Sequence, residues 1–391
     1  MGTKFLLSAS VLLSISACYH EEDKDDPVVS STHYAVVSTS GGPNDSGDVS
    51  IISLDDYSVD NTNFGSGSDT VISTNEDNFY LISRFKTDSV TKFKISDPEN
   101  FDWQYSSNRP NTNEEKSNPY KLLVKNDTTA YLIRYGHKVI SIVDPSASSF
   151  ENFHTGEIDL SSYAGDDEIP EATDALLIGD KLYVLMQNLD RINGWIVGQA
   201  YLAIFDTNDN SEVVTNDDST TPNGISLIGT NPLQMEYLST TNSIYIAANG
   251  PYFGDNQFSG GVEVVNLSDY SSSIVIDDGT ADDHPYGKIN NIAILNASRA
   301  YFIGYTATED TAIFSFNPTT GEVDNMALME NEDISDIEIG PLGNLWITNR
   351  KNSGITIINT VDNSIFKELI DTDLVPSDIE FISVQSTEIS E

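Results

Sequence analysis

The sequence has a single cysteine, Cys18, and few residues that commonly bind metals. One cysteine excludes disulfides within the chain and metal sites that need several thiolates. The five histidines are scattered without HxH or HExxH spacing, so we expect no histidine-rich metal centre. No stretch keeps apolar residues at helical spacing over three turns, which argues against a helical domain.

Positive charge is also scarce, because 19 Lys+Arg stand against 61 Asp+Glu in 391 residues and the formal net charge is −42. Each contact with a nucleic-acid phosphate needs a cation, so we expect no nucleic-acid partner. Hydrophobic residues make up 38% of the chain, which is enough to bury a large core. We therefore expect a folded and strongly acidic protein.

The first residues have the features of a bacterial lipoprotein signal. Residues 1–17 contain Lys4, an apolar run at 5–15 and small residues, as in a secretory signal peptide. Ile15-Ser16-Ala17-Cys18 fits the lipobox, in which the cysteine is acylated and becomes the new amino terminus. We predict that Cys18 is lipidated, and several buried acyl chains attach a protein to a membrane permanently.

The residue after the cysteine, Tyr19, is not the aspartate that would indicate retention in the inner membrane, so we expect the outer membrane. Residues 18–32 are acidic and form a predicted flexible tether. A second hypothesis is that this acidic segment is an export tag of surface lipoproteins. The domain would face the periplasm in the first case and the cell surface in the second.

The rest of the chain repeats one pattern, in which an aromatic residue opens a short β-rich run. The aromatic residues of the seven copies are Tyr34, Tyr80, Tyr131, Tyr183, Tyr245, Tyr301 and Trp346. A second β-rich run that ends in a polar turn follows each copy, and an alternating strand precedes most copies. Units of about 45–60 residues with about four short strands each are typical of β-propeller blades. Blades bury their faces against one another, so the repeated aromatic residues should lie in the core.

The end of the repeat region predicts how the ring closes. Residues 377–381 repeat the pattern of residues 335–339, yet no further aromatic strand follows them. We expect the strand at 375–384 to complete blade one, which begins near His33 with its second strand, so that no sheet edge is left open. The predicted fold is all-β: a seven-bladed β-propeller of four-stranded antiparallel blades over residues 33–384, with a tail at 385–391.

These repeats resemble the YVTN/YncE-like propellers of bacterial extracytoplasmic proteins. The resemblance rests on the aromatic strands, on Asn-Pro before an innermost strand, and on apolar runs that end in Asp or Asn before a turn. Examples are Asn118-Pro119, Asn231-Pro232, Val143-Asp144-Pro145 and Phe316-Asn317-Pro318. It implies binding or scaffolding and supplies no fixed catalytic residues.

A ligand is expected where the loops between the second and third strands of the blades (strands B and C, counted from the axis) surround the central funnel. Two of these loops, at about 187–200 and 249–261, are long and carry aromatic residues. Four of the six arginines also fall at B–C loops and would suit a small anionic ligand. The predicted ligand-binding residues are Arg84, Arg134, Arg191, Trp195, Tyr252, Phe253 and Arg350. The alternative is that these arginines pair with nearby carboxylates.

Polar residues recur at the start of the innermost strands and should converge on the axis. They are Lys121, Asp174, Gln234, Asn291, Asp336 and Asp378. The carboxylates of Asp174, Asp336 and Asp378 could hold Ca²⁺ in the central channel. They could equally cap turns or bind water.

No GxSxG, P-loop or GxGxxG motif occurs, so we predict no catalytic residues. The main hypothesis is a lipid-anchored outer-membrane propeller that binds a small ligand or a partner protein without catalysis. The alternatives are a metal-dependent propeller hydrolase or lyase, such as a lactonase, that uses the axial carboxylates, and a structural protein of the cell surface.

Overall fold

A computed structural model of the chain describes residues 28–42, 46–114, 116–216, 222–253, 257–307, 310–324 and 326–388. The predicted signal peptide, Cys18 and most of the predicted tether lie outside these residues. The helices of the described part are short: α1 (Phe150–Phe153), η1 (Ser161–Tyr163) and η2 (Arg350–Asn352). None of its helices has the length and apolar character needed to span a membrane.

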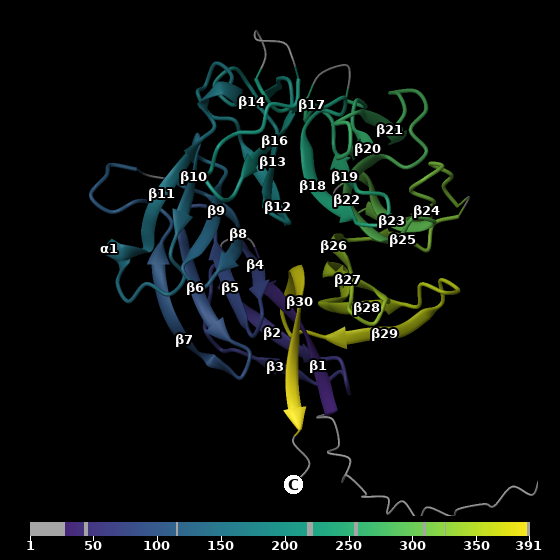
Figure 1. The fold of residues 1–391 in the computed structure, drawn as a ribbon. Coiled ribbons are helices and arrows are strands. Elements are labelled where there is room, and N and C mark those ends of the chain that lie inside the picture. Colours follow the sequence, from purple (N-terminus) through teal and green to yellow (C-terminus); the bar gives the residue numbers. More distant parts are fainter. Residues whose placement is uncertain are drawn as a thin grey trace, which may run out of the picture. The chain divides into compact units, whose positions relative to one another are not determined.

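The strands form seven four-stranded antiparallel sheets around a common axis (Figure 1). This arrangement is a seven-bladed β-propeller, as predicted. The blades lie within one compact unit, Thr32–Val384.

The strands of each blade run in order from the innermost, at the axis, to the outermost. Blade one contains β30 (Val375–Glu388), β1 (Val28–Ser40), β2 (Gly47–Ser53) and β3 (Val59–Asn61). Blade two contains β4 (Thr70–Asn75), β5 (Asn78–Ser83), β6 (Ser89–Lys94) and β7 (Asp97–Ser106). Blade three contains β8 (Pro119–Asn126), β9 (Thr129–Arg134), β10 (Val139–Val143) and β11 (His154–Asp159).

Blade four contains β12 (Ala172–Ile178), β13 (Lys181–Met186), β16 (Tyr201–Asp206) and β17 (Ile225–Ser226). Its B–C loop carries a small hairpin of β14 (Leu189–Asp190) and β15 (Ile196–Val197). Blade five contains β18 (Pro232–Leu238), β19 (Ser243–Ala248), β20 (Gly261–Asn266) and β21 (Ser272–Ile276). Blade six contains β22 (Lys288–Asn296), β23 (Arg299–Ala307), β24 (Asp310–Phe316) and β25 (Met329–Glu332). Blade seven contains β26 (Ile334–Ile339), β27 (Leu345–Asn349), β28 (Gly354–Ile358) and β29 (Ile365–Asp371).

The repeated aromatic residues all lie in the second strands, and six of the seven are buried, Tyr34 being partly buried. Successive side chains of a strand point to opposite faces, so each blade offers two apolar faces to its neighbours. The buried clusters accordingly lie between consecutive blades. One joins blades one and two, for example, and another joins blade seven to blade one.

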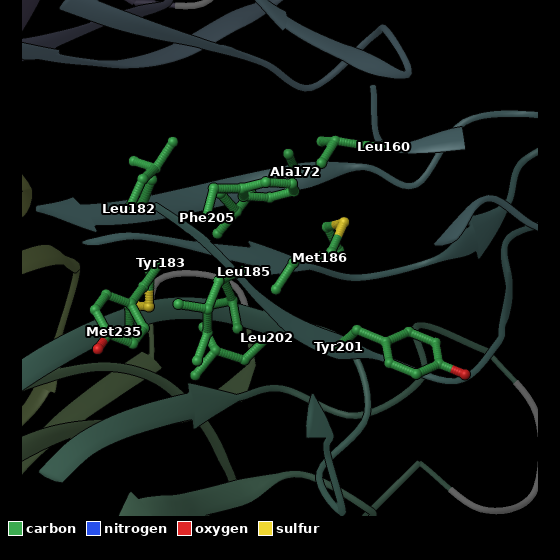
Figure 2. Packing of buried hydrophobic residues seen from close by; sticks show 14 of the residues in the cluster. Leu160, Ala172, Leu182, Tyr183, Leu185, Met186, Tyr201, Leu202, Phe205 and Met235 are labelled. Carbon is green, nitrogen blue, oxygen red and sulfur yellow. The ribbon is translucent and has the colours of Figure 1, made fainter. Parts of the chain in front are cut away.

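The layers on the two sides of blade four show this alternation. Leu182 pairs with Phe205 on one face, where Leu160 of blade three is also found (Figure 2). Tyr183 lies on the opposite face beside Met235 of blade five (Figure 2). Burial of large apolar side chains in such layers is the main force that holds blades together.

The ring closes through β30, which joins β1 as the innermost strand of blade one (Figure 1). Side chains reinforce this pairing of strands that are far apart in sequence. The hydroxyls of Ser38 and Ser377 are 2.8 Å apart, and His33 Nδ1 lies 2.7 Å from Ser383 Oγ. The predicted closure of blade one by a C-terminal strand is therefore confirmed.

Candidate functional site

The innermost strands begin at the end of the propeller where the B–C loops lie, which we call the B–C loop face. In blade four, for example, Ala172 at the start of β12 pairs with Met186 at the end of β13, just before the B–C loop. Near this end, six strands carry a polar residue at equivalent positions, as predicted from the sequence. These residues are Lys121, Asp174, Gln234, Asn291, Asp336 and Asp378, and all six line one axial cavity of about 630 Å³.

Most members of this polar ring accept a hydrogen bond from the backbone of the next blade. Asp174 Oδ2 accepts from the N–H of Met235 at 2.9 Å, and Gln234 Oε1 accepts from that of Ile292 at 2.8 Å. Asp336 and Asp378 do the same for later blades. Innermost strands of neighbouring blades do not pair as a sheet, so these N–H groups need side-chain partners. These bonds join blade four to five, five to six, seven to one and one to two.

The predicted calcium site is not assembled from Asp174, Asp336 and Asp378. One oxygen of each carboxylate is held by a backbone N–H, and Asp174 Oδ1 also lies 2.7 Å from Lys121 Nζ. Among the residues that the structure describes, no three His, Cys, Asp or Glu side chains are grouped to hold a metal ion. These aspartates act as hydrogen-bonded joints between blades.

A second set of acids, which was not predicted from the sequence, lies two positions further along the same strands. Glu236, Glu338 and Glu380 line the axial cavity below the polar ring. The sequence pattern that could have predicted these glutamates is the repeated Asp-Ile-Glu of 336–338 and 378–380, because residues i and i+2 of a strand share a face.

Burial governs the ionisation of these glutamates. It raises the pKa of Glu236 to about 8 and that of Glu380 to about 7, with neighbouring carboxylates adding to the effect and Lys121 opposing it. Burial and the nearby glutamates also raise the pKa of Glu338 well above its ordinary value. The axial cavity therefore contains six carboxylic groups and favours protonation of several of them.

Two of the predicted arginines line the axial cavity, namely Arg84 and Arg350. Arg84 forms an ion pair with Asp69 at 2.6 Å, and its guanidinium lies 4.7 Å from the ring centre of Tyr120. Arg350 Nε lies 3.3 Å from an oxygen of Asp333. Both cations are thus at the cavity, and both are paired with local carboxylates.

Arg134 does not occupy the predicted ligand-binding position, because its side chain is only 1% exposed and lines neither the axial cavity nor the second cavity of this face. It forms an ion pair with Glu114 at 2.8 Å. Glu114 also binds Arg109, which in turn contacts Glu157. In β9 the side chain of Arg134 shares a face with Leu132, in the layer between blades two and three. Its role is structural.

Arg191 belongs to a row of stacked groups that crosses three blades. Its guanidinium lies 5.8 Å from the ring centre of Tyr135, and Tyr135 stacks on Tyr120 with centroids 4.7 Å apart. Arg84 completes the row on the far side of Tyr120. Arg191 is held by Glu171 at 3.1 Å, and burial raises the pKa of Glu171 to about 8. The row ends at the rim of the axial cavity, where Arg84 and Tyr120 line the wall.

The predicted aromatic residues of the two long loops come together at the B–C loop face. Trp195 and Tyr252 meet edge to face with ring centroids 6.4 Å apart. Tyr252 lines a second cavity, whereas Phe253 is 70% exposed. The two loops therefore make contact above the blades that carry them.

The second cavity, which we call the side cavity, has a volume of about 570 Å³. It is lined mainly by residues of blades five and six, among them Asn249, Tyr252, Phe258, His284 and Lys288. Leu233, Asn290 and Ser335 line both cavities, so the side cavity adjoins the axial cavity. Of the residues that line the side cavity, only Tyr252 was predicted from the sequence to bind a ligand.

Fold and site together define a seven-bladed propeller with two adjoining cavities at its B–C loop face. No protein family model matches the sequence, and no curated protein matches it. Solved structures do match. BF1038 of Bacteroides fragilis, a candidate 6-phosphogluconolactonase, has a TM-score of 0.59 and 14% identity, over 93% of this chain and 99% of its own.

Two further bacterial structures are similar. The periplasmic gluconolactonase PpgL of Pseudomonas aeruginosa has a TM-score of 0.57 and 12% identity, covering 90% of this chain and 99% of its own. Apo AztD of Citrobacter koseri has a TM-score of 0.54 and 10% identity, covering 93% of this chain and all 100% of its own. At these identities the similarity establishes a shared propeller fold, and function must be argued from the site.

Proposed function

We propose that this protein is a lipid-anchored outer-membrane propeller that holds a small ligand, or part of a partner protein, at the B–C loop face without catalysis. The observation that carries the proposal is the pair of adjoining cavities at this face, of about 630 and 570 Å³. Cavities of this size accommodate small organic ligands. Tyr120, Tyr252 and Phe258 supply aromatic walls, and Arg84 and Arg350 supply cations.

The proposed address comes from the sequence of residues 1–18 and supports an anchor at Cys18. The direction of β1 adds an argument. His33 lies near the start of β1, and the B–C loop of blade one follows Ser40 at its other end. A lipid attached upstream of His33 would leave the B–C loop face at the far end of blade one, open to ligands.

Ligand binding is tested by titrating the detergent-solubilised full-length protein with a panel of small anionic and neutral compounds, followed by calorimetry. For a compound that binds in the axial cavity, Arg350→Gln should weaken binding at least tenfold. Lys94→Gln makes the same charge change at an exposed site at the other end of a blade and should leave affinity unchanged. Equal affinities for both variants would contradict a role for Arg350 and the rim.

The anchor is tested separately in cells that express the protein. Labelled palmitate should be incorporated into the native protein and not into Cys18→Ser. Protease treatment of intact cells should then degrade the propeller if it faces the outside and spare it if it faces the periplasm. Labelling that persists in Cys18→Ser would overturn the proposed anchor.

A hydrolase such as a lactonase is the second proposal, and one observation favours it. Burial brings the pKa of Glu380 to about 7 and that of Glu236 to about 8, within the range of a general acid or base at neutral pH. The test is hydrolysis of simple aldonolactones by the full-length protein, with Glu236→Gln as the variant. Hydrolysis that is lost in Glu236→Gln would replace the non-enzymatic proposal.

A further inference from the structure

The side cavity differs from the axial cavity in charge. The axial cavity has six carboxylic groups in its walls, and its three cations, Arg84, Lys121 and Arg350, are each paired with a carboxylate. Among the described residues that line the side cavity, Lys288 is the one Lys, Arg, Asp or Glu. An anion would be repelled by ionised carboxylates of the axial cavity. The side cavity is therefore better suited than the axial cavity to the proposed anionic ligand.

Lys288 is available to such a ligand. Its ammonium donates one hydrogen bond to the carbonyl of Pro251 at 2.6 Å, and an ammonium has three donors. No described carboxylate lies within 4.0 Å of Lys288 Nζ, so no described acid competes with a ligand for its charge. Burial lowers the pKa of Lys288, and the more distant Asp278 opposes this effect. An anion bound beside the ammonium would favour its charged form.

Aromatic rings form a wall of the side cavity. Phe258 stacks on His284 with centroids 4.3 Å apart and planes inclined by 19°, and Tyr252 lines the same cavity. His284 Nδ1 lies 2.9 Å from the carbonyl oxygen of Thr280. A carbonyl only accepts, so Nδ1 carries the hydrogen, and in the neutral ring Nε2 is an acceptor for a hydroxyl. The wall thus suits a ring that carries hydroxyl groups.

Two amides lie where the side cavity meets the axial cavity. Asn249 Nδ2 donates to Asn290 Oδ1, so this bond fixes how both amides are oriented. Asn249 Oδ1 can then accept from a ligand hydroxyl, and Asn290 Nδ2 can donate to a ligand oxygen.

We propose that the side cavity binds a hydroxylated ring that carries one carboxylate, with the carboxylate on Lys288, the ring against Tyr252 and Phe258, and hydroxyls on the amides and His284. Sugar acids and phenolic acids share this chemistry. The inference rests on the proposed ligand-binding function and specifies the ligand class and its subsite.

The experiment is calorimetric titration of the full-length protein with two carboxylates and their neutral counterparts. Glucuronate is compared with glucose, and 3,4-dihydroxybenzoate with catechol. We expect one of the two carboxylates to bind at least tenfold more tightly than its neutral counterpart. The carboxylate that does so shows whether the ligand is a sugar acid or a phenolic acid. If neither carboxylate binds more tightly than its neutral counterpart, the inference is overturned.

Three variants test the assignment to Lys288. Lys288→Gln should weaken the carboxylate tenfold or more and leave the neutral compound unchanged, whereas Lys288→Arg should retain most of the affinity. Asn290→Asp keeps the acceptor for Asn249 but adds a negative charge, so it should weaken the carboxylate selectively. Lys138→Gln, at an exposed lysine of another B–C loop, is the matched control. Binding that survives Lys288→Gln and is lost in Arg350→Gln would refute this subsite while leaving the proposed function in place.

Discussion

Asp378 Oδ2 accepts a hydrogen bond of 2.6 Å from the backbone N–H of Ile72, a residue 306 positions earlier in the chain. The bond joins the strand that closes blade one to the innermost strand of blade two. It is equivalent to the bond between Asp336 and Ile379 across the preceding pair of blades. Each such joint supplies a partner to a backbone donor near the axis.

Replacement of Asp378 tests the joint. Asp378→Ala leaves the N–H of Ile72 without this acceptor, and we expect the free energy of unfolding to fall by about 1–3 kcal/mol. Asp378→Asn retains an acceptor oxygen, and burial already favours the neutral form because it raises the pKa of Asp378. The asparagine variant should therefore stay close to the native protein in urea unfolding; equal losses in both variants would contradict the assigned role.

The buried ion pair of Arg134 and Glu114 gives a second prediction. Glu114→Gln leaves the guanidinium of Arg134 buried without its charged partner, so we expect a loss of about 3–5 kcal/mol. Glu168→Gln removes the acid of the exposed pair with Lys138 and should cost less than about 1 kcal/mol. Urea unfolding of the two variants side by side makes the comparison, and similar losses would argue against burial as the cause.

The glutamates of the axial cavity predict how stability depends on pH. Burial raises the folded-state pKa of Glu236 and Glu380 to about 8 and 7, whereas an unfolded glutamate titrates near 4.5. The folded state then binds more protons than the unfolded state between these values, so its stability falls as pH rises. The contribution is complete below about pH 4.5 and is lost by about pH 8.

The double variant Glu236→Gln/Glu380→Gln isolates this effect from the general repulsion of a chain with net charge −42. Urea midpoints measured between pH 5 and 9 should fall more steeply for the native protein than for the double variant. Parallel curves would mean that these two carboxyl groups do not titrate differently in the two states.

Loss of the row of stacked groups at the rim gives a fourth prediction. Tyr135→Leu keeps an apolar side chain but removes the stacking on Tyr120, the cation–π contact with Arg191 and the hydrogen bond from the hydroxyl to Gln187 Oε1. We expect a loss of about 1–3 kcal/mol, since each such contact contributes about 0.5–1.5 kcal/mol beyond burial. Tyr252→Leu, outside this row, should cost less, and calorimetric melting of both variants checks the order.

The repeats predicted the blade number and the closure of the ring because each aromatic strand recurs with the same buried role, as Tyr80 and Tyr301 illustrate. The polar ring was also predictable, since equivalent strand positions meet at the axis. Arg134 was misplaced because its position before a B–C loop does not reveal which face of β9 it occupies. Lys288 was missed because its suitability as a ligand-binding cation depends on how close the surrounding carboxylates lie. Only the three-dimensional structure gives those distances.

The pairing of β1 with β30 sets the order of events in folding. Ser38 and Ser377, which meet across this pair, are 339 residues apart. A chain that emerges from its N-terminus therefore has to deliver nearly the whole domain before blade one receives its innermost strand. Until then its second strand offers an unpaired edge, which is a site for pairing with other chains.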